Sequence, residues 1–195
     1  MEFAFPTQTI HGRDGREYTM RALTLADIPA LQVFGRGLSA ESTLNFEPHG
    51  YSEEHLTHQL TRAELGEDVA VGVFADEDNQ LVGYASLWDV HTPTTILCIG
   101  LSDEYQGKGL GPQLLDALVA AAGACGCMGV DLTCMPENDR ALRLYISRGF
   151  VEYGMVKNVF GDGKVGMERG MLLSLREGAA RAMEHVAPCL RFKEW

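Results

Sequence analysis

Gln106-Gly107-Lys108-Gly109-Leu110-Gly111-Pro112 is the most informative stretch of this chain, and it lies between a strand-like apolar run at 96–101 and a helix-like run at 110–124. The first main-chain N–H groups of a helix have no acceptor inside it, and the helix dipole adds partial positive charge at that end. Glycines let such a backbone approach a ligand closely, and Lys108 could add a full charge. The stretch therefore predicts a strand, a turn that binds pyrophosphate, and a helix.

Two common phosphate-binding patterns do not match this turn. A P-loop requires Gly-Lys-Ser/Thr, but Lys108 is followed by Gly109, and the last glycine position of a Rossmann fingerprint is occupied by Pro112. The spacing Gln-x-x-Gly-x-Gly, from Gln106 through Gly109 to Gly111, resembles the coenzyme A loop of the GNAT acyltransferase superfamily. From this stretch alone, a glycine-rich turn without a ligand is the remaining alternative.

A second motif occupies 136–150 and follows a strand-like run at 129–134. Asn138 or Asp139 can cap a helix start, and Gly149 can end that helix. The motif resembles the GNAT pattern of Asn, Ala, Leu-Tyr and Gly-Phe. The matching residues are Asn138, Ala141, Leu144, Tyr145, Gly149 and Phe150.

The resemblance implies one catalytic residue and a set of cofactor contacts. In the family, the tyrosine lies near the thioester sulfur and can protonate the departing thiolate, which assigns that role to Tyr145; an ordinary half-buried core tyrosine is the alternative. A main-chain N–H of the central splayed strand polarises the thioester carbonyl, and pantetheine runs beside that strand. The cofactor-binding positions implied are Ile99, Leu101, Gln106, Gly107, Lys108, Gly109, Leu110, Gly111 and Asn138.

The general base departs from the family pattern. Many relatives carry a glutamate at the start of the central strand, where this chain has Thr95. Threonine cannot act as a base at neutral pH, so a nearby carboxylate or histidine would have to act, directly or through water. The candidates are Glu41, Glu47, Asp89 and His91, and an acceptor amine of low pKa would need no dedicated base.

The order of the predicted elements also resembles the GNAT fold. We expect an α/β (α+β) fold with a central mixed, mostly antiparallel sheet of about seven strands, flanked by helices and splayed at the central strands. The first predicted strand is 18–23, and the first ten or so residues fall outside the fold. Residues 1–175 are expected to form a single GNAT acyltransferase domain, followed by a C-terminal helical tail at 176–195 with weak helical spacing.

Charge and composition limit the partners and the location. The net charge of −11 over 195 residues argues against nucleic acid and against an anionic membrane surface as partners, and it would attract cationic amines. No apolar run reaches the roughly 18 residues that span a membrane, and no secretory signal is evident. An odd count of five cysteines without an export signal fits a reducing cytoplasm, so we expect a cytoplasmic protein.

No metal site is expected, because Cys125 and Cys127 do not have zinc-ligand spacing and His55 with His58 is a weak ligand pair. Cys98 and Cys134 have no histidine nearby in the sequence, which disfavours a covalent cysteine intermediate.

The function implied by the resemblance is an acetyl-CoA-dependent N-acetyltransferase. It would move the acetyl group to a primary amine of a small molecule or peptide by direct attack in a ternary complex. A non-catalytic coenzyme A-binding sensor or scaffold module is the alternative that Thr95 keeps open. Family members are often dimers, so two copies of this chain could form a homodimer through the final strands or the tail.

Overall fold

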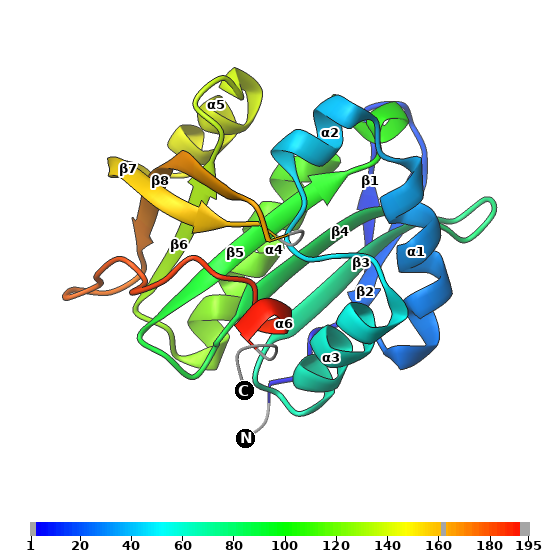
Figure 1. Cartoon of the computed structure of the whole chain (residues 1–195). Helices are drawn as coiled ribbons and strands as arrows, with labels where there is room; N and C mark the ends of the chain where they lie inside the picture. Colours follow the sequence, from blue (N-terminus) through cyan, green and yellow to red (C-terminus); the bar gives the residue numbers. More distant parts are fainter. Residues whose placement is uncertain (1–2, 161–162, 192–195) are drawn as a thin grey trace.

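The computed structural model describes residues 3–160 and 163–191. An open, mixed sheet is flanked by helices on both faces (Figure 1), and its eight strands follow the order β1-β2-β3-β4-β5-β6-β8-β7. Neighbouring strands pair antiparallel, except β5 and β6, which run parallel. In chain order the elements are β1 (Gln8–His11), β2 (Glu17–Ala22), η1 (Leu25–Asp27), α1 (Ile28–Gly37), α2 (Ala40–Asn45), α3 (Glu53–Glu64), β3 (Val69–Ala75), β4 (Gln80–Trp88), β5 (Thr94–Leu101), η2 (Asp103–Tyr105), α4 (Leu110–Cys125), β6 (Gly129–Cys134), α5 (Asp139–Ser147), β7 (Val151–Val159), β8 (Val165–Ser174) and α6 (Pro188–Arg191).

Two apolar layers cover the central strands. On one face, α4 contributes Leu114 and Leu118 to a core cluster that also contains Val71 and Val73 of β3. On the other face, α1 and α3 pack with Tyr84 of β4 in a second core cluster. Every residue of β3 is buried, as expected for a strand that is covered on both faces.

The central strands separate, as the sequence predicts. β5 and β6 pair from Thr94↔Gly129 to Ile96↔Asp131, and the pairing ends there. Beyond that point β5 continues along β4 as far as Leu101, while β6 continues along β8 as far as Cys134. The edge of β5 that faces β6 therefore has no strand partner over 97–101 in the described part of the chain.

Two predictions about the ends of the chain are wrong. Gln8–His11 is an additional edge strand rather than a segment outside the fold, because a tight turn at 12–16 pairs it with β2. Gly15 in that turn has a φ of 80°, and Asp14-Gly15 is a typical turn signal that could have predicted the hairpin. The sheet consequently has eight strands instead of seven.

The tail is the second correction. Residues 176–187 form no helix, and the described helix of the tail is limited to α6. The tail crosses the ends of β5 and β6 instead, where Thr94 Oγ1 donates to Ala180 O and the Ala182 N–H donates to Asp131. Ala187 and Cys189 are buried against Trp88 of β4. These contacts outweigh a weak helical periodicity. An unpredicted short helix, α2, begins at the cap Ser39.

No described helix is both long enough and apolar enough to cross a bilayer. The described residues also contain no group of three or more His, Cys, Asp or Glu side chains that could hold a metal ion.

A buried histidine links the α2–α3 connection to the sheet. Within the core, His49 Nε2 lies 2.7 Å from the Tyr84 hydroxyl, and Nδ1 lies 3.1 Å from Gly50 O. A neutral ring satisfies both contacts by donating from Nδ1 and accepting at Nε2. Complete burial lowers the pKa of His49 from 6.5 to about 4.

This lowered pKa predicts acid sensitivity. Between about pH 6.5 and about pH 4 the unfolded His49 binds a proton that the folded ring does not, so the free energy of unfolding falls as the pH is lowered through that window. The contribution is at most roughly 3 kcal/mol. Urea denaturation across this range should show a shallower pH dependence for His49→Asn than for wild type. His91→Asn, at an exposed position, should keep the wild-type dependence. Equal dependence in His49→Asn and wild type would contradict the assignment.

Candidate active site

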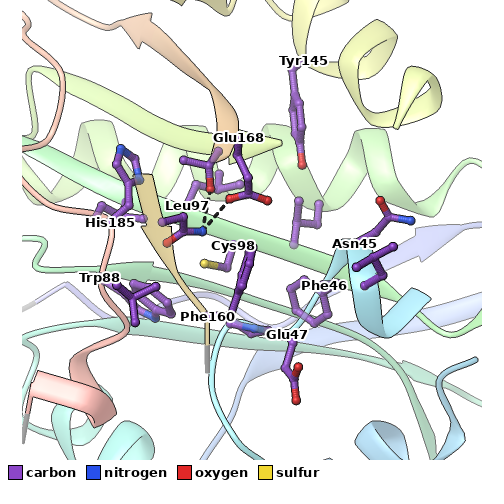
Figure 2. A pocket seen from close by; sticks show the side chains of 17 residues that line it. Asn45, Phe46, Glu47, Trp88, Leu97, Cys98, Tyr145, Phe160, Glu168 and His185 are labelled. Carbon is purple, nitrogen blue, oxygen red and sulfur yellow. Dashed lines mark hydrogen bonds between the residues drawn. The ribbon is translucent and has the colours of Figure 1, made fainter. Parts of the chain in front are cut away.

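The separation of β5 and β6 leaves a cavity of about 70 Å³, here called the central cavity. Its walls come from the end of α2 and the residues that follow it, from β4, β5 and β6, from α5, from the β7–β8 hairpin and from the tail (Figure 2). Segments from both halves of the chain thus contribute to one site.

The glycine-rich turn lies at the end of β5 and presents free main-chain donors. Gly107 has a φ of 77° and Gly109, the N-cap of α4, has a φ of 81°, values that favour glycine. Within the described residues, the N–H groups of Gly107, Lys108 and Gly109 donate to no main-chain or side-chain acceptor. The Lys108 carbonyl accepts instead from the Arg13 N–H at 2.7 Å, so the turn is supported from behind. The arrangement can bind an anion at the start of α4.

The sequence suggested Lys108 as the positive charge beside this turn, but in the structure Lys108 is paired and a second cation, Arg13, lies over the turn. Lys108 Nζ lies 3.3 Å from Asp14 Oδ2 and 4.4 Å from the centroid of the Tyr105 ring, so its charge is paired within the protein. Arg13, from the β1–β2 turn, extends over Gly109, and its Nε lies 3.2 Å from the position that a Cβ on Gly109 would take. Sequence reasoning missed Arg13, because strand pairing alone brings it to the turn.

Gly111, in the first turn of α4, faces side chains of both β5 and α5. A Cβ at Gly111 would lie 3.7 Å from Leu101 Cδ1 of β5 and 3.8 Å from Leu144 Cδ2 of α5. The predicted position Leu110 is different, since its side chain is in the core and only its main chain can face a ligand. Ile99 and Leu101 lie on the part of β5 that has no pairing with β6.

The side chain of Gln106 makes structural hydrogen bonds rather than pointing along the turn. Its Nε2 donates to Leu101 O at 3.2 Å and to Ser42 Oγ at 3.0 Å. Asp103 accepts from both Ser39 and Ser42, at 2.7 and 2.8 Å. These bonds attach α2, which forms one wall of the central cavity, to the segment between β5 and α4.

The second motif forms α5, as predicted. Asn138 caps the helix, because its Oδ1 accepts from the Ala141 N–H at 3.1 Å. Tyr145 lines the central cavity, is 7% exposed and packs its ring against Phe150. Its hydroxyl points into the cavity and has no hydrogen-bond partner among the described residues (Figure 2). Burial, with smaller contributions from Cys134 and neighbouring groups, raises the pKa of Tyr145 well above its usual value, so the hydroxyl keeps its proton.

The buried cysteines are poor nucleophiles. Burial raises the pKa of Cys134 to about 12 and raises that of Cys98, which also lines the cavity, well above the usual range. Because the thiolate is the reactive form, this environment disfavours a covalent cysteine intermediate. None of the five cysteines, all of them in the described part of the chain, forms a disulfide bond.

The base candidates from the sequence are mostly elsewhere. Thr95 is fully buried and donates to Trp88 O at 2.6 Å. Asp89 pairs with Arg62 and Arg191, and Glu41 and His91 are exposed. Among the four candidates only Glu47 lines the central cavity, and its carboxylate points away from the other labelled side chains (Figure 2).

A carboxylate that sequence reasoning missed lies in the cavity. Glu168 of β8 lines it, is 4% exposed, and accepts from Asn158 Nδ2 at 2.6 Å. Trp88 and His185 also contribute to the lining. No local pattern marked Glu168, because β8 also carries the charged residue Arg169, and nothing in the sequence indicated that His185 of the tail reaches this place.

Comparisons with known proteins agree with this geometry. The model of the Acetyltransferase (GNAT) family matches residues 38–150. A curated relative, L-methionine sulfoximine/L-methionine sulfone acetyltransferase of Salmonella typhimurium strain LT2, is 28% identical over 142 residues, which cover 70% of this chain and 78% of the relative.

Solved structures share the fold. The GNAT domain of S. lividans PAT superposes with a TM-score of 0.70 at 18% identity, covering 87% of this chain and 97% of that domain. The yncA acetyltransferase of Salmonella typhimurium, solved with acetyl-CoA, gives a TM-score of 0.66 at 22% identity, covering 85% and 98%. Since the family model spans more than half of the 195 residues and the sheet shows the splayed strands, the chain belongs to the GNAT acetyltransferase family.

Proposed function

We propose that this protein transfers an acetyl group from acetyl-CoA to the primary amine of a small molecule bound in the central cavity, by direct attack in a ternary complex. The observation that carries the proposal is the position of the Tyr145 hydroxyl. It is buried, protonated and without a partner in the described part of the chain, and it faces a cavity beside the unpaired edge of β5. Acetyl-CoA supplies the acetyl thioester.

The residues around the gap between β5 and β6 suit the binding of acetyl-CoA. The free N–H groups at 107–109 suit a pyrophosphate, and the space between Leu101 and Leu144 beside Gly111 suits an extended chain leading inward. The unpaired edge of β5 at 97–101 offers main-chain groups that can pair with that chain as an added strand.

The chain's own groups supply the proton and the electrostatic help. A main-chain N–H of β5 near Ile99 donates to the thioester oxygen as it gains negative charge. The amine loses its extra proton to water, and its neutral nitrogen attacks the carbonyl carbon. The C–S bond breaks, Tyr145 gives its proton to the departing sulfur, and the proton released from the acylated nitrogen returns to the Tyr145 oxygen. The raised pKa of the Cys98 and Cys134 thiols supports attack without a protein-bound acetyl group.

A small acceptor fits better than a protein segment. The volume of about 70 Å³ accommodates a compact molecule, and the similar Salmonella enzyme is named for two small molecules. The alternative function, a coenzyme A-binding module without catalysis, is favoured by the buried position of Thr95 where relatives carry a base. Thiol release from acetyl-CoA across a panel of primary amines separates the two, since a module without catalysis releases none above background.

Replacement of Tyr145 by phenylalanine tests the proton donor. Tyr145→Phe keeps the packing against Phe150 but removes the hydroxyl, so we expect kcat to fall roughly tenfold or more, at the low end of general-acid effects. The affinity for coenzyme A, measured by calorimetry, should stay at the wild-type value and serves as the control. An unchanged kcat would reject the role of Tyr145.

A second substitution tests the site proposed for coenzyme A. Gly111→Val adds methyl groups between Leu101 and Leu144 without requiring an unusual φ, so we expect the dissociation constant for coenzyme A to rise at least tenfold. Gly123→Val, in the same helix α4 with nothing within 4 Å of its added Cβ, should bind like wild type. Calorimetric titration of both variants decides the assignment, and equal affinities for the two would contradict it.

A further inference from the structure

Glu168 is a buried carboxylate without a charged partner. It lies on β8 and lines the cavity, and its Oε2 accepts a hydrogen bond from Asn158 Nδ2, which also donates to Thr133 Oγ1 at 3.1 Å (Figure 2). In the described part of the chain Glu168 forms no ion pair with Lys, Arg or His. The neighbouring Arg169 pairs with Glu152 instead. An isolated buried carboxylate is costly, so a cation that enters the cavity would be stabilised by it.

The rest of the cavity lining provides no competing cation. Among the described residues that line it there is no Lys or Arg. The histidine of the lining, His185, has its Nε2 3.6 Å from Asp131 Oδ2 and 3.1 Å from the Tyr153 hydroxyl, so that nitrogen already faces partners within the protein. A ligand that brings its own carboxylate, as do the two amino acids for which the similar Salmonella enzyme is named, would therefore find no positive partner among the described residues of the cavity.

The cavity also limits the size and shape of the ligand. A buried water needs about 10–15 Å³, so a cavity of about 70 Å³ is several times larger than one water and suits a compact ligand. Trp88, 4% exposed, lies at the other end of the cavity from Tyr145, and its Nε1–H has no hydrogen-bond partner among the described residues (Figure 2). A neutral oxygen on the ligand would satisfy that donor.

The geometry points to Glu168 as the group that binds the acceptor's ammonium, and to a compact primary amine bearing a neutral hydrogen-bond acceptor, but no carboxylate, as the acceptor. This inference rests on the proposed acetyl transfer and narrows its substrate class. Glu168 and Tyr145 line the same cavity, and Glu168 is among the groups that contribute to the raised pKa of Tyr145, so an amine bound to Glu168 shares the cavity with the hydroxyl that the proposed reaction uses.

Matched acceptors test the inference. Glycinamide and glycine, and L-alaninamide and L-alanine, differ within each pair by a carboxamide in place of a carboxylate. We expect wild type to show a kcat/KM at least tenfold higher for each amide than for its acid. Glu168→Gln keeps an acceptor oxygen for Asn158 but loses the charge, so it should raise KM for the amides at least tenfold and reduce the amide-to-acid ratio. The amide and the acid differ in the basicity of their amines, but each compound has the same basicity with either protein. Comparing the amide-to-acid ratio of wild type with that of Glu168→Gln therefore removes this difference.

The control variant is Glu152→Gln, which removes one negative charge from the neighbouring strand β7 outside the cavity and should keep the wild-type ratio. A merely structural role for Glu168 would lower activity equally for amides and acids, and an unchanged ratio in Glu168→Gln would overturn the inference.

Titration of glycinamide into the coenzyme A-bound protein gives a readout apart from catalysis. Binding in wild type that Glu168→Gln loses, without thiol release, would sink the proposed reaction but not the ammonium site. Absence of both binding and thiol release would overturn both.

Discussion

The site of this protein depends on two central strands that are each held by a different neighbour. β5 pairs with β4 over 96–101 and β6 pairs with β8 over its whole length, but β5 and β6 share only the pairs from Thr94↔Gly129 to Ile96↔Asp131. Because strands in a sheet twist, two parallel strands tied to separate antiparallel partners move apart once their own pairing stops. The gap leaves main-chain donors and acceptors that must be satisfied, and a ligand strand can satisfy them.

One wall of the gap is fixed to the glycine-rich turn. Phe46 packs so closely on β5 that a Cβ at Gly100 would lie 2.3 Å from its Cδ1. Hydrogen bonds from Ser42 to Asp103 and from Gln106 to Ser42 then tie α2 to the segment that leads into α4. The residues expected to bind acetyl-CoA and those that line the central cavity are therefore connected. A displacement of one set would move the other.

Local signals predicted much of this arrangement. The glycines at 107 and 109 have the positive φ values that such a turn requires, and Asn138 caps α5 so that Tyr145 faces the splay. The features that depend on contacts between distant segments were not predicted. Arg13 reaches the turn only because β1 joins the sheet. The tail forms hydrogen bonds to strands that are distant in the sequence and is not helical where it does so. Glu168 has no local pattern that marks it, since its burial depends on the packing of β8 beside the gap.

By itself the sequence determined the elements whose chemistry is local: a strand, a glycine turn and a helix with free N–H groups, and a second helix with a capping residue and an inward tyrosine. These follow from φ preferences, caps and periodicity, which act over a few residues. The tertiary structure alone decided how wide the central strands open, which carboxylate lies in the cavity, and that Lys108 is paired with Asp14. Those features arise from contacts between segments distant in the chain, and no short stretch of sequence contains the information for them.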